Sequence, residues 1–213
     1  MSKLRLELFS DGVFAIVLTL LVLDLKPPTL HGIAGLWQIT PALLVHALVF
    51  IMVGINWMLH HRLSLAVRAV SPSDLATNLF VLFWVTLIPF GARIAAETPL
   101  DPLGISILCF ITGAFMLGGS LALGGLVAQT TDDTILRVLR NRNRVLRAIA
   151  AAAFLFALLC WVSPWLGYAF LVLQQFGVLQ KPVVSRIANL EVNNTSSHNG
   201  SAYDIAVAER LQT

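Results

Sequence analysis

Charged residues are scarce in this chain. Only 12% of its 213 residues are Asp, Glu, Lys or Arg, whereas 57% are hydrophobic and the mean hydropathy is +0.82. A soluble domain carries about 25% charged residues, so the composition excludes one. Apolar stretches of the roughly 20 residues that cross a bilayer recur along the sequence. We therefore expect an all-α membrane protein.

Cysteine is also scarce, and no catalytic constellation is visible. The two cysteines, Cys109 and Cys160, lie inside apolar segments, where a buried thiol acts as a small hydrophobic side chain. The sequence has no spacing typical of a disulfide framework or a metal site. It also has no glycine-rich phosphate loop and no nucleophile paired with a base. The sequence therefore predicts neither an enzyme nor a bound metal or cofactor.

The hydropathy pattern predicts six membrane-spanning segments within one domain, residues 1–180. The segments are expected at residues 8–25, 37–59, 75–94, 103–128, 146–162 and 165–179. Pro89 is expected to kink the third segment, because proline cannot donate a backbone hydrogen bond. Residues 181–213 are polar and are expected to form a disordered cytoplasmic tail.

Lysine and arginine are unevenly distributed between the two ends of these segments. Twelve of the fourteen lie on one side, and only Lys26 and Arg93 lie on the other. Loops rich in positive charge stay in the cytoplasm, so an even number of spans with both termini cytoplasmic is predicted. The arginine-rich connection at residues 137–147 is interpreted as a topology determinant that contacts anionic lipid. The alternative for this connection, a nucleic-acid site, is not favoured.

An acid, Asp11, lies inside the first apolar segment. Arg5, Phe9, Ser10 and Asp11 form the pattern Arg-x-x-x-Phe-Ser-Asp at its start. An unpaired carboxylate in hydrocarbon costs several kcal/mol, so Asp11 is expected to face protein or water. We expect Ser10 and Asp11 to hydrogen-bond to polar groups of the second or third segment. The candidate partners are His46, Asn56, Trp57, His60, His61, Asn78 and Trp84.

The first segment also carries an aliphatic stripe. At about 100° per residue, Ile16, Leu20 and Leu23 fall on one side of a helix, Thr19 borders them, and Asp11 lies almost opposite. The stripe could face lipid or pack against another helix. Alternatively, several copies could surround an axis and form a hydrophobic constriction that gates by dewetting, with Thr19 adding a ring of hydroxyl groups. The Thr-Val-Gly-Tyr-Gly carbonyl filter of potassium channels is absent, so any selectivity is expected to be weak.

The Arg-x-x-x-Phe-Ser-Asp pattern resembles the start of the transmembrane protein 175 family of potassium-permeable channels, and the six spans agree with that family in number and order. The resemblance implies a homotetramer in the cell membrane of a prokaryote, with the first helix lining a central pore for potassium, other monovalent cations and protons. It also assigns roles to single residues. These are the constriction (Ile16, Leu20 and Leu23), a selectivity-supporting hydroxyl (Thr19) and a scaffold for the pore helix (Arg5, Phe9, Ser10 and Asp11).

A small secondary transporter is the alternative function. A transporter of this kind would show broken helices, repeated halves and charges near the middle of the membrane. Asp11 lies near one end of its segment, and no inverted repeat is evident between the two halves of the sequence. The expected partners are therefore monovalent cations, further copies of the chain and the lipid bilayer, and not nucleic acid.

Overall fold

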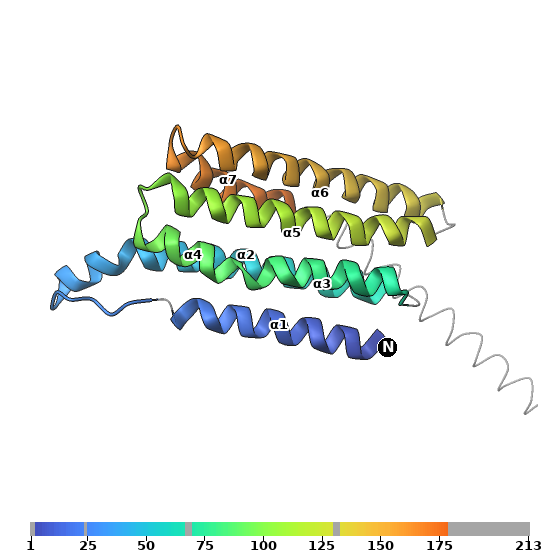
Figure 1. The fold of residues 1–213 in the computed structure, drawn as a ribbon, viewed down its shortest axis with the longest axis horizontal. Coiled ribbons are helices and arrows are strands. Elements are labelled where there is room, and N and C mark those ends of the chain that lie inside the picture. The colour runs from blue at the N-terminus through green and yellow to red at the C-terminus, as the bar shows by residue number, and fades with distance from the viewer. Residues whose placement is uncertain (1–2, 24, 67–69, 130–132, 179–213) are drawn as a thin grey trace, which may run out of the picture. The chain divides into compact units, whose positions relative to one another are not determined.

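The computed structural model describes residues 3–23, 25–66, 70–129 and 133–178. In these ranges it contains seven α-helices and no β-strand (Figure 1). The helices are α1 Lys3–Leu23, α2 Ile33–Ala66, α3 Pro72–Thr86, α4 Ile88–Glu97, α5 Pro102–Gln129, α6 Asp133–Leu159 and α7 Pro164–Val178. The tail predicted at residues 181–213 lies outside the described residues.

The six predicted segments are all helical and occur in the predicted order. Four of them are long and apolar enough to cross a membrane, namely α1, α2, the α3–α4 pair and α5. The last two differ: α7 has only 15 residues, and α6 is arginine-rich in its first half. α6 also begins at Asp133 and not near residue 146, because the basic connection is itself helical. The protein is thus an all-α, multi-pass membrane protein.

The third predicted segment is divided into two helices at Leu87. Pro89 lies in the first turn of α4 and has no N–H to donate to the preceding turn. The Leu87 N–H bonds the Trp84 carbonyl at 3.3 Å, which closes a tighter turn than that of an α-helix. The kink expected at Pro89 is therefore a break between α3 and α4.

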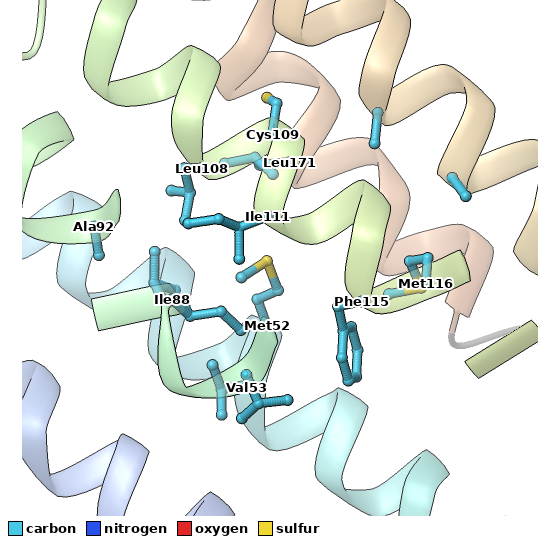
Figure 2. Close-up of a cluster of buried hydrophobic side chains, with 14 of the residues drawn as sticks. Met52, Val53, Ile88, Ala92, Leu108, Cys109, Ile111, Phe115, Met116 and Leu171 are labelled. Carbon is cyan, nitrogen blue, oxygen red and sulfur yellow. The ribbon is translucent and has the colours of Figure 1, made fainter. Parts of the chain in front are cut away.

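α5 is the central helix, because it packs against α3, α4, α6 and α7. Met52 of α2, Ile88 of α4 and Leu108 of α5 are at most 1% exposed and lie in one buried cluster (Figure 2). Two α5 glycines allow close approach: a Cβ on Gly104 would lie 2.5 Å from the Ala95 backbone nitrogen, and one on Gly118 would lie 2.9 Å from a Val81 methyl. Small residues let helices pack this closely where lipid supplies no hydrophobic driving force.

α1 packs on one side only, against α2, α3 and α4 (Figure 1). Its buried residues, Ser10, Phe14, Val17 and Leu21, recur every three or four positions and so form one face. The Phe14 ring lies with its centroid 5.4 Å from that of His60 on α2. Among the described residues, none covers the opposite face of α1.

Candidate pore-lining helix

The outward face of α1 contains the aliphatic stripe that the sequence predicted. The side chains of Ile16, Leu20 and Leu23 are 59%, 42% and 76% exposed. Thr19 and Gly12 are exposed on the same face, and a Cβ added to Gly12 would meet no atom within 4 Å. In a membrane, this face must be covered by lipid or by other copies of the chain.

Thr19 places a hydroxyl on this face in a defined orientation. Its Oγ1 donates a hydrogen bond to the Ile16 carbonyl at 2.8 Å, a common arrangement for threonine in helices. Because the hydroxyl hydrogen is used inside the helix, the oxygen lone pairs are left to accept. The Thr19 oxygen is therefore suited to coordinate a cation.

Asp11 lies on the flank of α1 and contacts α2. Trp57 Nε1 donates to Asp11 Oδ1 at 2.8 Å. His61 Nδ1 lies 3.8 Å from Asp11 Oδ2, an ion-pair distance that is too long for a hydrogen bond. The rings of Trp57 and His61 stack with centroids 5.8 Å apart. Two of the candidate partners thus meet this acid.

Ser10 connects α1 to α3 in the interior of the bundle. Ser10 is 1% exposed, its Oγ donates to the Leu6 carbonyl at 2.9 Å, and Asn78 Nδ2 donates to the same Oγ at 3.0 Å. Asn78 is itself buried. Consecutive residues of the motif thus bind different helices, and together they fix the rotation of α1 about its axis.

The remaining candidate partners make other contacts. His46 Nδ1 donates to the Leu21 carbonyl at 3.2 Å, near the other end of α1. Asn56 Nδ2 donates to the Met52 carbonyl of its own helix at 2.9 Å, and Trp84 packs against aromatic rings of α3 and α5. Within the motif, Arg5 and Phe9 are exposed.

A cavity of about 90 Å³ lies behind the motif, between α1, α2, α3 and α5. Ser10, Asn78 and His60 line it together with Glu7 and Asp74, which the sequence analysis did not single out. Glu7 lies three residues before Ser10 and therefore shares its helix face. This spacing could have identified Glu7 from the sequence. Asp74 could have been identified from the capping box that it forms with Ser71.

The two ends of the bundle differ in charge. Lys26 Nζ and Arg93 Nε lie 2.9 Å and 3.1 Å from the same oxygen of Glu97, at the end where α1 finishes and α4 finishes. The basic first turns of α1 and the arginine-rich first half of α6 lie at the opposite end (Figure 1). The described part of the chain thus shows the segregation of basic residues that the sequence predicted.

These features define a class: a multi-pass helical membrane protein whose first helix is held on one face by polar contacts and leaves an aliphatic face uncovered. Residues 5–89 match the model of the family described as endosomal/lysosomal potassium channel TMEM175. Residues 5–89 of the chain are thus similar to the TMEM175 family, in agreement with the resemblance of its sequence motif.

Three relatives illustrate this similarity. Over 113 residues the chain is 42% identical to a potassium channel of Chryseobacterium sp. (strain P1-3), covering 51% of this chain and 59% of the relative. Over 136 residues it is 34% identical to the endosomal/lysosomal proton channel TMEM175 of Danio rerio, covering 55% and 26%. The crystal structure of a lysosomal potassium-selective channel TMEM175 homolog from Chamaesiphon minutus aligns with a TM-score of 0.72 at 26% identity, covering 83% of this chain and 95% of that one. The chain spans about half the length of the curated bacterial relatives it matches.

Proposed function

We propose that this protein is a passive, potassium-permeable cation channel with weak selectivity, in which four copies surround a pore lined by α1. The observation that carries this proposal is the uncovered face of α1, where exposed aliphatic side chains alternate with the Thr19 hydroxyl. The names of the relatives, potassium channel and proton channel, support the same class of function.

In such a pore, Ile16, Leu20 and Leu23 form three apolar layers along about 10 Å of the axis, at 1.5 Å per residue. Apolar layers this narrow exclude water and thereby gate conduction. The Thr19 oxygens form a polar ring between the first two layers and replace part of the hydration shell of a passing cation. Side-chain hydroxyls discriminate weakly compared with carbonyl rings, so the selectivity for potassium is modest. When the layers are hydrated, the same water file carries protons.

The end of the bundle that carries most of the basic residues faces the cytoplasm of a prokaryotic cell in this proposal, because positively charged connections are retained there. Both termini are then cytoplasmic. The Lys26–Glu97–Arg93 cluster lies on the outer side.

The test is ion flux into liposomes that contain the purified chain, under separate potassium, sodium and proton gradients and without an energy source. Ile16→Asn is expected to raise the potassium flux several-fold, because an amide side chain hydrates the narrowest layer. The matched control is Leu173→Asn, a comparably exposed aliphatic position on α7 (65% against 59% exposed), where no change is expected. Unchanged flux in Ile16→Asn with correctly assembled protein would remove Ile16 from the constriction.

One observation favours the alternative, a small secondary transporter: the α3–α4 break is the kind of discontinuous helix that transporters use. The break is short, however. Leu87 keeps helical dihedral angles, and its N–H is bonded. No charged residue lies between Leu82 and Gly91, so the break presents no charged group to a coupling ion. Uphill movement of one ion driven by the gradient of another, in the same liposomes, would establish a transporter and overturn the channel.

A further inference from the structure

We propose that the outward face of α6 is a binding site for an anionic phospholipid. α6 packs against α5 and α7, and the part of the chain that the structure describes leaves its remaining surface open. The site follows from how charge and apolar surface are arranged along that open face.

Four arginines form one stripe on this face. Arg137, Arg140, Arg144 and Arg147 are all exposed. Their spacing of three, four and three residues places them within about 80° of the helix circumference and along about 15 Å of its axis. No acidic residue occurs in α6 after its first residue, Asp133. The stripe is therefore a strongly positive strip without acidic neighbours on its own helix.

The same face becomes apolar where the arginines end. Ala148 and Ala151 are exposed, followed by Leu155 and Leu158, which are 55% and 71% exposed. These positions continue the stripe at helical spacing. One helix face thus presents cationic groups over its first half and aliphatic groups over its second half.

A phospholipid with an anionic headgroup has the same two parts in the same order. Guanidinium groups bind phosphate through paired, charge-assisted hydrogen bonds, and acyl chains lie against the aliphatic half. Arg147 is held at the boundary between the two halves, because its Nε donates to Ser120 Oγ of α5 at 3.2 Å. Asn143 also bonds Ser120. The remaining guanidinium N–H groups of Arg147 are thereby fixed near the level at which the phosphate would lie.

Two other occupants fit this face less well. A nucleic acid would match the arginines but would leave the exposed leucines without a partner. A second copy of the chain meeting this face with its own α6 would bring the arginines of both copies together, which is electrostatically unfavourable.

The experiment is native mass spectrometry of the purified full chain in detergent. Phosphatidylglycerol and phosphatidylcholine with identical acyl chains are titrated separately. The wild-type chain is expected to retain phosphatidylglycerol preferentially. An arginine near an anionic lipid surface contributes about 1 kcal/mol, or roughly 5-fold in affinity, so Arg140→Gln/Arg144→Gln should bind phosphatidylglycerol roughly 25-fold more weakly.

Two further variants keep the result interpretable. Arg140→Lys/Arg144→Lys preserves the charge and should lose only the paired hydrogen bonds, giving a loss of a few-fold. Lys26→Gln/Arg93→Gln removes two positive charges at the other end of the bundle and should leave phosphatidylglycerol binding within twofold. Size-exclusion profiles and circular dichroism establish that each variant is folded.

Other outcomes overturn the proposal. Equal retention of the two lipids by the wild-type chain, or an unchanged affinity in Arg140→Gln/Arg144→Gln, excludes an anionic-lipid site on this face. Competition by soluble glycerol phosphate at the same concentrations would show a phosphate site that does not need a lipid. Dissociation of the oligomer in the glutamine variant, without loss of lipid, would make the face a contact between copies of the chain.

Discussion

The contact between Asp11 and Trp57 provides a quantitative test of how α1 is held. Trp57 Nε1 donates to Asp11 Oδ1 at 2.8 Å, and the acid is only partly exposed, at 35%. A hydrogen bond to a charged group contributes about 1.5–3 kcal/mol. Partial exposure places this one toward the lower end, at about 2 kcal/mol. Trp57→Phe should therefore lower the free energy of unfolding by about 2 kcal/mol, plus a smaller loss of packing.

A double-mutant cycle separates the hydrogen bond from that packing loss. Asp11→Ala and Trp57→Phe are made singly and together, and unfolding in detergent is followed by circular dichroism with the oligomer measured by native mass spectrometry. We expect a coupling energy of about 1.5–2 kcal/mol. The matched control is Trp165→Phe, whose side chain is 67% exposed on α7, and it should show no coupling to Asp11.

The same variants test the role of Asp11 in conduction. Under the proposed function, Asp11→Ala reduces the amount of assembled protein, while the channels that do assemble keep the wild-type ion preference. Additive free energies in the cycle would show that the hydrogen bond does not stabilise α1. A well-assembled Asp11→Ala oligomer with altered ion preference would show instead that the acid contacts the permeating ion.

Three further predictions address single contacts. Thr19→Ala should shift the reversal potential toward equal permeability for potassium and sodium, whereas an unchanged reversal potential in bilayer recordings would exclude the hydroxyl ring. Gly104→Ala should lower the melting temperature in detergent, because its Cβ would overlap the α4 backbone. Gly12→Ala should leave the melting temperature unchanged or raise it slightly, since alanine favours helix by about 1 kcal/mol over glycine. Equal changes in melting temperature for the two variants would contradict the close packing at Gly104. Ser10→Ala should cost about 1–3 kcal/mol of unfolding free energy, because it leaves the buried Asn78 amide without its partner, and a loss below about 0.5 kcal/mol would show that the amide finds another one.

Periodicity was sufficient to predict which residues of α1 share a face, although it did not decide what covers that face. Ile16, Thr19 and Leu23 share a side at any helical pitch near 100° per residue, so this grouping needed no tertiary information. The choice among seven candidate partners for Ser10 and Asp11 did need it. That choice depends on how α2 and α3 are rotated against α1, which packing contacts such as Phe14 against His60 determine.

The helix boundary that hydropathy misplaced, the start of the fifth segment, also has a physical explanation. Hydropathy measures how much of a segment can lie in hydrocarbon, and it therefore started the fifth segment at residue 146. Helix propensity follows a different property: arginine and leucine are both strong helix formers, so the basic connection continues the helix back to Asp133. The cavity was not predictable, because Glu7 and Asp74 are distant in sequence and only the packing of α1 against α3 brings them to one cavity.

The contacts that hold α1 also explain why residues outside the aliphatic stripe should determine the direction in which the stripe faces. A shift of one residue in how α1 packs would rotate its side chains by about 100° and turn Ile16 toward the bundle. Such a rotation would break the Ser10–Asn78 and Asp11–Trp57 hydrogen bonds together, and unsatisfied polar groups are costly in hydrocarbon. The two bonds therefore select one rotation of the helix. In the proposed tetramer, that selection gives all four copies the same constriction.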